Sequence, residues 1–553
     1  TLLQGAALFP QQIALAATFN PHLAREAGRI AARDSRAAAV PWLFAPILGL
    51  ATQPLWSRVY ETFGEDPLLT SRMGAALVKG IQASLEWGGN ADDGEPLRAA
   101  ACMKHFVGYS HPSSGHDRSP SRIPEQELLE LYLPPFQAAV DAGVSSAMES
   151  YNELNGVPLA SSRKFLVDVL RGRMGFLGML VTDYAEIVNL EGHHKVSAGP
   201  EESVFMAMED TSIDMSMVPL DATFAETLLG LVRAGQVSEN RIERSVRRVL
   251  ALKESLGLLD SPVPSLQSPL LNQVGGAEDR EAALNAAREA ITLLKNRDMP
   301  SSGTGNDGGG GRALPLVRSR TKKLLLVGPA CDSLQLQSGG WTKHWQGALG
   351  PGDFSATEGR TILQGIRSLL DGSLEVGEDG NSSPGGDGQE GSPGGEDEPE
   401  VEVVYKKGIR VDGTHDKDRD DALSEAFSAD AIVACVGEPA YAEKNGDLKQ
   451  LDLPKGIAAF VKDLKLVSDD TTPIILALVE GRPRLLGDLP GMVDAVLHTY
   501  LLGPAGGQAV AEVLFGSVNP SGRLPITYPR YSGNVPMPYH RPVSEECQVL
   551  LHK

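Results

Sequence analysis

The chain has few cysteines and no long hydrophobic run. Four cysteines occur in 553 residues and none forms a Cys-x-x-Cys pair, so neither a disulfide-stapled scaffold nor a zinc or redox motif is indicated, and the redox compartment stays open. No apolar run reaches the roughly 18 residues that a membrane-spanning helix needs. The first residues, Thr1–Gln4, contain no initiator Met and no basic stretch, so we expect that the natural beginning of the protein lies upstream.

Positive charge is also scarce. Lysine and arginine number 50 against 71 aspartates and glutamates, which gives a formal net charge of -21. A strongly acidic protein is repelled by nucleic acid phosphates and by anionic lipid surfaces, so neither is an expected partner. Neutral or cationic small molecules remain open as ligands.

The length predicts two domains, since a single core rarely extends over so many residues. In the first, residues 1–258, nearly continuous apolar runs alternate with longer helical patterns. The predicted strands are residues 40–47, 100–107, 144–151, 178–183 and 211–217. Runs that are apolar on both faces are typical of parallel sheets, and strand–helix alternation favours a TIM-like (β/α)8-type barrel. Five strands are visible where a complete barrel has eight, so the barrel is expected to be incomplete at its amino-terminal end.

A second α/β pattern occupies residues 322–540, after an interdomain linker at 259–321 that includes a predicted helix at 280–294. The predicted strands are residues 323–328, 401–405, 431–437, 473–479 and 493–500. This pattern predicts an α/β/α sandwich. Residues 372–400 are rich in Gly, Ser, Pro, Asp and Glu and are expected to be a disordered insertion, and residues 541–553 form an atypical tail.

Polar side chains stand where the predicted barrel strands end, which is the active-site face of such barrels. These residues are Arg58, Glu61, Lys104, His105, Met148, Tyr151 and Asp183. Asp183 is well placed for a nucleophile, and the cations Arg58 and Lys104 would keep it ionised. The alternative is that each is a structural ion pair or a helix cap. The Lys104-His105 pair fits that alternative poorly, because a lysine is costly to bury.

A series of short blocks follows in one order along nearly the whole chain. They are Phe9-Pro10 with Ala16–Pro21, Arg58–Pro67, Lys104–Tyr109, Met148–Gly156, Val181–Tyr184, Ile213–Met217, Leu293–Asn296, Gly339–Thr342, Gly437-Glu438, Glu480–Pro483 and Gly522–Pro525. Any one block is weakly specific, but the ordered set resembles glycoside hydrolase family 3, of the β-glucosidase and β-glucan exohydrolase type. The resemblance implies a secreted or vacuolar hydrolase that needs no cofactor and releases terminal β-D-glucose from β-glucosides or β-glucans by double displacement.

The resemblance also implies a role for particular residues. Asp183 is the expected nucleophile, and Glu443, within Tyr441–Asp447, is the expected general acid/base. The residues expected to bind the first sugar are Arg58, Lys104, His105, Met148 and Tyr151, together with Tyr184 of the nucleophile block. Trp341 and Trp345 are expected to clamp the next sugar. Hydrolysis by double displacement retains the anomeric configuration of the sugar. It requires two carboxyl groups, one ionised and one protonated, close to the scissile bond.

Some assignments have rivals. Glu438 is a second candidate for the acid, and His116-Asp117 resembles the acid/base pair that bacterial N-acetylglucosaminidases of this family use. Trp341 and Trp345 could instead be core residues. His193-His194 is read as packing rather than metal-binding, because no third ligand has suitable spacing.

Glu61 and Asp66 are interpreted as structural, closing a turn and capping the next helix. The sequence also departs from the family: an aspartate motif expected upstream of Phe9 is absent, and the usual segments after Pro525 are missing. We therefore expect truncation at both ends. The alternatives are a non-catalytic glucan-binding paralogue, or a hydrolase for another sugar such as xylose or N-acetylglucosamine.

Overall fold

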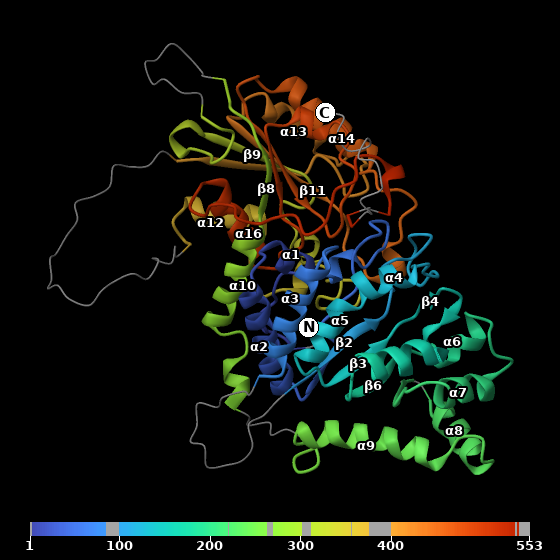
Figure 1. The fold of residues 1–553 in the computed structure, drawn as a ribbon. Coiled ribbons are helices and arrows are strands. Elements are labelled where there is room, and N and C mark those ends of the chain that lie inside the picture. Colours follow the sequence, from blue (N-terminus) through green and yellow to red (C-terminus); the bar gives the residue numbers. More distant parts are fainter. Residues whose placement is uncertain are drawn as a thin grey trace.

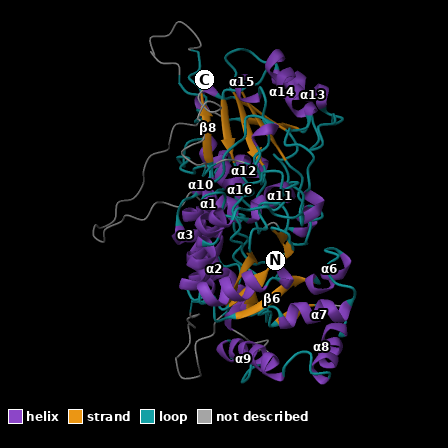
Figure 2. Cartoon of the chain, turned by 45° about the vertical axis from the view of Figure 1, so that its right-hand side comes forward, coloured by secondary structure: helices purple, strands orange, loops and turns teal. Residues whose placement is uncertain are grey.

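The computed structural model describes residues 3–83, 99–218, 221–262, 269–300, 311–355, 357–374, 400–536 and 539–540. Most of the predicted insertion at 372–400 and the predicted tail at 541–553 lie outside the described residues. Within them two sheets form, one above the other in Figure 1, and Figure 2 shows the strands of both in orange.

The lower sheet is parallel and has five strands in the order β1-β2-β3-β6-β7. The strands are β1 (Trp42–Leu43), β2 (Ala100–Phe106), β3 (Ser146–Glu149), β6 (Met179–Tyr184) and β7 (Met215–Met217), and β4 (Glu153–Leu154) and β5 (Val157–Pro158) form a separate hairpin. The helices beside them are α1 (Gln12–Ala17), α2 (Pro21–Ala37), α3 (Pro67–Ile81), α4 (Glu125–Glu127), α5 (Pro134–Asp141), α6 (Glu186–Gly192), α7 (Pro200–Glu209), α8 (Thr223–Arg233) and α9 (Glu239–Ser255). This confirms the incomplete (β/α) barrel.

The upper sheet has six strands in the order β10-β9-β11-β12-β13-β8. The strands are β8 (Thr292–Asn296), β9 (Lys323–Val327), β10 (Glu402–Lys406), β11 (Ala431–Gly437), β12 (Ile474–Val479) and β13 (Ala495–His498). The accompanying helices are α10 (Ala277–Ala290), α11 (Leu334–Ser338), α12 (Ile362–Leu370), α13 (Arg419–Ala426), α14 (Lys455–Val467), α15 (Leu489–Met492) and α16 (Gly506–Leu514). Separate apolar clusters pack on its two faces, as in the predicted α/β/α sandwich.

Local sequence signals explain several helix boundaries. The Asp66 carboxylate accepts a hydrogen bond from the Leu69 N–H at 2.7 Å and so caps α3, as predicted. The Ser238 hydroxyl caps α9 in the same way through the Arg241 N–H. A π-helical turn at Leu128–Tyr132 separates α4 from α5, which begins at Pro134.

The bounds predicted for two elements are wrong. The helix predicted at 280–294 stops at Ala290, and Thr292–Asn296 pairs antiparallel with β13 at the edge of the upper sheet. A short leucine-rich run suits either a helix or a strand, so tertiary pairing decides it. The strand predicted at 40–47 is regular only at Trp42–Leu43, because Pro46 has no N–H to donate to a sheet.

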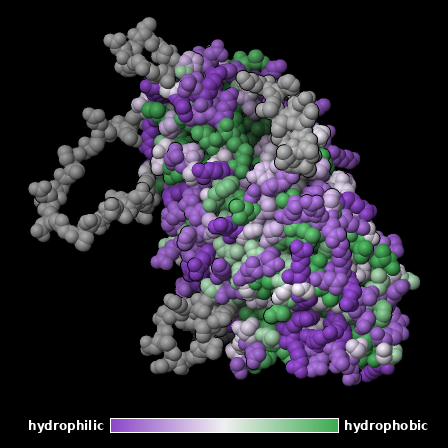
Figure 3. All heavy atoms as spheres, in the orientation of Figure 1, coloured by the Kyte–Doolittle hydropathy of each residue, from purple (hydrophilic) through white to green (hydrophobic). Residues whose placement is uncertain are grey.

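A disulfide forms in the domain that contains the upper sheet, which we call the upper domain. The sequence analysis did not predict which cysteines pair. Cys331 follows β9 and Cys435 lies on β11, and both are fully buried. Cys102 is buried and free. Within the described part of the chain, no helix is both long enough and apolar enough to cross a membrane. Hydrophilic side chains cover most of the face drawn in Figure 3.

After the last strand of the upper sheet, the chain contacts the domain that contains the lower sheet, which we call the lower domain. The Arg523 N–H donates to the Ala17 carbonyl at 2.9 Å, and the Glu65 N–H donates to the Pro525 carbonyl at 3.1 Å. The Glu65 carboxylate in turn accepts hydrogen bonds from the N–H and the hydroxyl of Thr527, at 2.6 and 2.5 Å. Residues 523–527 therefore fasten the two domains together.

We predict that Glu65→Gln flattens the loss of stability with rising pH. Burial raises the pKa of Glu65 to about 7, although its hydrogen bonds with Thr527 lower it. A raised pKa means that the protonated form stabilises the fold below about pH 4.5, and that this contribution is lost as the pH rises to about 7. The slope from one such group reaches at most about 1.4 kcal/mol per pH unit.

Urea unfolding between pH 4.5 and 8 measures this slope. The variant is expected to be as stable as the wild type near pH 4.5 and more stable near pH 8. Glu243→Gln, an exposed glutamate in α9, is the matched control and should keep the wild-type slope. Equal slopes for the wild type and Glu65→Gln would contradict the prediction.

Candidate active site

Asp183 lies at the end of β6 and is buried. Its Oδ1 accepts a hydrogen bond from the Tyr184 N–H at 2.7 Å, and its own N–H donates to Glu149 Oε1 at 3.0 Å. His105 Nε2 is 3.5 Å from Asp183 Oδ2, and the Tyr151 hydroxyl also interacts with this carboxylate. Among the described residues, no hydrogen bond reaches the buried Oδ2, so one oxygen remains available to a reacting group.

Arg58 is the central cation of the site. Its Nε and Nη2 each donate to Glu61 at 2.8 Å, and its Nη1 lies 3.6 Å from Glu443 Oε1. Glu61 is thus structural, as predicted, but its partner is a site residue. Lys104 lies in β2, with its Nζ 5.9 Å from the centre of the Phe44 ring.

The charge state of Asp183 reflects two opposed effects. Burial raises its pKa, while Arg58, Lys104 and the Tyr184 N–H lower it, and the net direction is upward. The sequence analysis expected the cations to keep Asp183 ionised. It could not include desolvation, because the burial of a residue depends on which distant segments pack around it. Burial likewise lowers the pKa of His105 well below its usual value, so this imidazole is neutral.

Glu443 comes from the upper domain, at the start of a 3-10 turn that spans Glu443–Gly446. Its Oε2 lies 3.0 Å from Arg118 Nη2. Burial raises the pKa of Glu443, and the neighbouring Arg58 and Arg118 oppose this shift without reversing it. A carboxyl group with a raised pKa retains a proton that it can donate.

Arg118 is a site residue that the sequence analysis missed. Its guanidinium lies 3.8 Å from the centre of the Tyr151 ring and also contacts Glu443. Tyr151 interacts with Asp183, so a continuous set of contacts joins the two carboxyl groups. The sequence analysis considered the adjacent His116-Asp117 pair, but no local pattern singled out this arginine.

The rival acid/base pair has a different environment. Asp117 Oδ1 accepts hydrogen bonds from Trp56 Nε1 at 3.0 Å and from the Tyr109 hydroxyl at 2.6 Å, while the Asp117 N–H donates to Asp447 Oδ1 at 3.0 Å. His116 is exposed. Asp117 therefore anchors its loop to the loop of Glu443.

Glu438, the rival acid, lies in a buried ionic cluster. It accepts hydrogen bonds from Arg482 Nε at 2.9 Å, Arg484 Nη1 at 2.8 Å and the Tyr441 hydroxyl at 2.9 Å. Burial alone would raise the pKa of Glu438, but the two arginines lower it below its usual value. An ionised carboxylate is unsuited to donate a proton.

The remaining predicted residues lie in different environments. Met148 packs with Cys102, Met179 and Val181 inside the lower sheet. Tyr184, Trp341 and Trp345 are 43%, 45% and 52% exposed, so the two tryptophans are not core residues. Their ring centres lie 6.5 Å apart.

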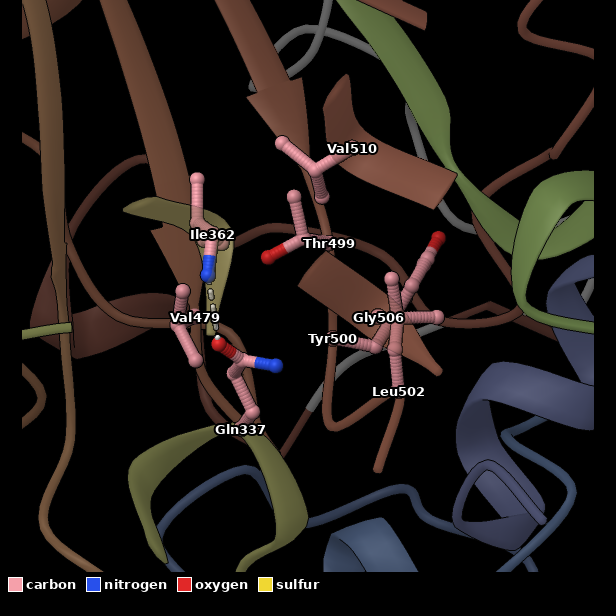
Figure 4. A pocket seen from close by; sticks show the side chains of 8 residues that line it. All are labelled: Gln337, Ile362, Val479, Thr499, Tyr500, Leu502, Gly506 and Val510. Atoms are coloured by element: carbon pink, nitrogen blue, oxygen red, sulfur yellow. Dashed lines mark hydrogen bonds between the residues drawn. The ribbon is translucent and has the colours of Figure 1, made fainter. Parts of the chain in front are cut away.

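Two other features lie apart from the catalytic candidates. His194 Nε2 lies 2.6 Å from Glu186 Oε1, and within the described ranges no three His, Cys, Asp or Glu side chains are grouped to hold a metal ion. A small recess in the upper domain, where the Ile362 N–H donates to Gln337 Oε1, contains none of the predicted site residues (Figure 4).

Comparisons with known proteins agree on a family. Residues 1–252 match the model described as the glycosyl hydrolase family 3 N terminal domain, and residues 291–550 match the glycosyl hydrolase family 3 C-terminal domain. A lysosomal beta glucosidase of Dictyostelium discoideum is 40% identical over 98% of this chain, and a periplasmic beta-glucosidase of Salmonella typhimurium is 31% identical over 96%. The chain spans 60% and 64% of these relatives.

Further relatives include a xylosidase and solved structures. A beta-xylosidase of Formosa agariphila is 30% identical over 96% of this chain and 67% of its own length. The crystal structure of a beta-glucosidase from Listeria innocua in complex with glucose has a TM-score of 0.78 and 26% identity, over 97% of this chain and 65% of that one.

We predict that replacing Glu438 by glutamine lowers the stability of the fold, whereas replacing Glu443 by glutamine does not. Glu438→Gln leaves two buried arginines without their counter-charge and should destabilise the fold by about 3–5 kcal/mol. Glu443→Gln removes a carboxyl group whose pKa is raised by burial, so the variant should be at least as stable as the wild type at pH 7. Thermal and denaturant unfolding of both variants tests this, and an equal loss of stability would contradict it.

Proposed function

The chain belongs to glycosyl hydrolase family 3, and on that premise we propose that it is a retaining, exo-acting β-glucosidase that releases terminal β-D-glucose from β-glucosides or β-glucans. The observation that carries this proposal is that Asp183 and Glu443, from different domains, share Arg58 and Tyr151 as neighbours. Two carboxyl groups in one buried, polar site are what retaining glycoside hydrolysis requires.

In the first step, the Asp183 carboxylate attacks the anomeric carbon of the terminal glucose. The bond to the glycosidic oxygen breaks, and this oxygen takes the proton of Glu443 as the leaving group departs. The Tyr184 N–H holds Asp183 Oδ1, which leaves Oδ2 for the attack. The product of this step is a glucosyl ester of Asp183.

In the second step, Glu443 acts as a base. It removes a proton from a water molecule, whose oxygen attacks the anomeric carbon and displaces Asp183. Glucose leaves with retained configuration, and both carboxyl groups return to their starting states. Arg58, Lys104 and His105 supply fixed donors for sugar hydroxyl groups, while Tyr184, Trp341 and Trp345 offer aromatic faces to the sugar rings.

A 2-deoxy-2-fluoro-β-glucoside with a good leaving group tests the nucleophile. The fluorine slows breakdown of the ester, so the label should accumulate on Asp183 within the tryptic peptide Met174–Lys195. Fragmentation must place it on Asp183 rather than on Glu186 or Glu191. The Asp183→Asn variant is expected to be unlabelled and to lose at least about 10³-fold in kcat.

A label on another carboxyl group would overturn the assignment of Asp183. No label on a protein that still binds glucose would overturn hydrolysis itself and favour the glucan-binding alternative.

The second candidate function is β-xylosidase activity, which the similarity to the Formosa enzyme supports. Xylose lacks the hydroxymethyl group of glucose, and a pocket built for that group should favour the glucoside by about tenfold or more in kcat/KM. A panel of nitrophenyl β-glucoside, β-xyloside and β-N-acetylglucosaminide measures this ratio. A preference for either of the other two sugars would replace glucose in the proposal.

The proposed location is secreted, extracellular or vacuolar. The printed names of the two β-glucosidase relatives, lysosomal and periplasmic, support it. The buried Cys331–Cys435 disulfide is also typical of an oxidising compartment.

A further inference from the structure

Two loops of the upper domain lie backbone against backbone beside the site. We call residues 339–347 the tryptophan loop, because it carries Trp341 and Trp345, and residues 438–447 the acid loop, because it carries Glu443. A Cβ atom on Gly340 would meet the Tyr441 carbonyl oxygen at 2.0 Å, and one on Gly347 would meet Ala440 Cβ at 2.8 Å. The close approach of the two loops thus depends on glycine at these positions.

Gln346 completes this contact. Its Nε2 donates to the Ala442 carbonyl at 3.1 Å, and its Oε1 accepts a hydrogen bond from the Ala442 N–H at 3.0 Å. One side-chain amide therefore satisfies both backbone groups of the residue that precedes Glu443, as a neighbouring strand would. Three consecutive residues of the acid loop are thus contacted by the tryptophan loop: Ala440 by Gly347, Tyr441 by Gly340 and Ala442 by Gln346.

Glu443 needs such support because of its backbone conformation. Its φ is +53°, in the left-handed region that residues other than glycine seldom adopt. Such a conformation is strained and persists where the surroundings hold it. The Tyr60 hydroxyl, which donates to the Tyr441 carbonyl at 2.8 Å, and Arg482 Nη2, which donates to the Gly446 carbonyl at 2.5 Å, fix the acid loop at two other points.

Resting on the proposed function, we propose that Gln346 is a positioning residue for Glu443 and that it couples the tryptophan loop to the acid loop as one unit. Trp345 is the neighbour of Gln346 in the chain, and the Trp341 N–H donates to the Trp345 carbonyl at 2.9 Å. A sugar held against the two tryptophans is thereby kept in register with the proton that Glu443 delivers to the glycosidic oxygen.

The choice of leaving group separates this role from general structural support. A phenolate or an alkoxide leaves slowly without a proton, whereas 2,4-dinitrophenolate leaves readily without one. Misplacing Glu443 should therefore slow cleavage of phenyl β-glucoside selectively. A general loosening of the site should slow both substrates, because both need Asp183.

Gln346→Leu tests the proposal. This substitution removes both hydrogen bonds to Ala442 and keeps a side chain of similar length. Its kcat/KM should fall about 10- to 100-fold for phenyl β-glucoside and by less than about threefold for 2,4-dinitrophenyl β-glucoside. Gln346→Glu, which can still accept from the Ala442 N–H, should lie between the wild type and Gln346→Leu.

Lys343→Met is the matched control within the tryptophan loop. Lys343 Nζ lies 2.5 Å from Glu358 Oε1, so the control loosens the loop without removing the amide at Ala442. It should keep the wild-type ratio between the two substrates. Equal losses on both substrates in Gln346→Leu, or the same altered ratio in Lys343→Met, would overturn the role of Gln346.

Hydrogen exchange supplies a readout that does not need turnover. In Gln346→Leu, amides of the acid loop should exchange at least about tenfold faster, while those of β11 (Ala431–Gly437) stay protected. If the wild type cleaves no glucoside, the proposed function fails, and the exchange result still decides the coupling. Unchanged exchange across residues 438–447 would overturn it.

Discussion

The site is organised around the ion pairs that the buried guanidinium of Arg58 makes. A charge this deep is stable only where opposite charges and hydrogen bonds compensate for its lost hydration. Glu61 supplies that compensation from the same loop through two hydrogen bonds, and Glu443 approaches from the other domain. Arg58 also lowers the pKa of Asp183 and so acts on both catalytic candidates. A neutral residue here would leave Glu61 as an unpaired buried carboxylate.

The contrast between Asp183 and Glu443 follows from their partners. Both carboxyl groups are desolvated, and desolvation raises both pKa values. Asp183 differs because a backbone N–H and a tyrosine hydroxyl also act on it, which favours its charged form. For Glu443, Arg58 and Arg118 oppose the effect of burial, while the carboxylates of Asp117 and Glu61 add to it. The pKa of both groups is raised, but different partners act on each carboxyl group.

Neither domain holds this arrangement alone. The acid loop contacts the lower domain through Tyr441, which meets Tyr60, and through Asp447, which meets Asp117. Arg482, which binds the acid loop at Gly446, also donates to the Leu55 carbonyl. Residues 523–527 fasten the same two domains at Ala17 and Glu65. The geometry of Glu443 thus depends on interfaces between residues hundreds of positions apart, and the tryptophan loop adds a third constraint from within the upper domain.

The sequence by itself determined what is local. Apolar runs predicted β2, β11 and β12, because parallel strands buried on both faces carry apolar side chains at most positions. Asp66 marked a helix start, because side-chain capping acts within one turn. Ordered family blocks pointed to Asp183, Arg58, Lys104, His105 and Glu443, since each lies in a recognisable stretch of chain.

Only the tertiary structure decided what depends on distant neighbours. Arg118 meets Glu443 across 325 positions, and Gln346 meets Ala442 across 96, so no local pattern reveals either pair. The pairing of β8 with β13, the Cys331–Cys435 disulfide and the upward shift in the pKa of Asp183 are of the same kind. Burial and pairing are set by which surfaces meet, and a residue's own segment does not carry that information.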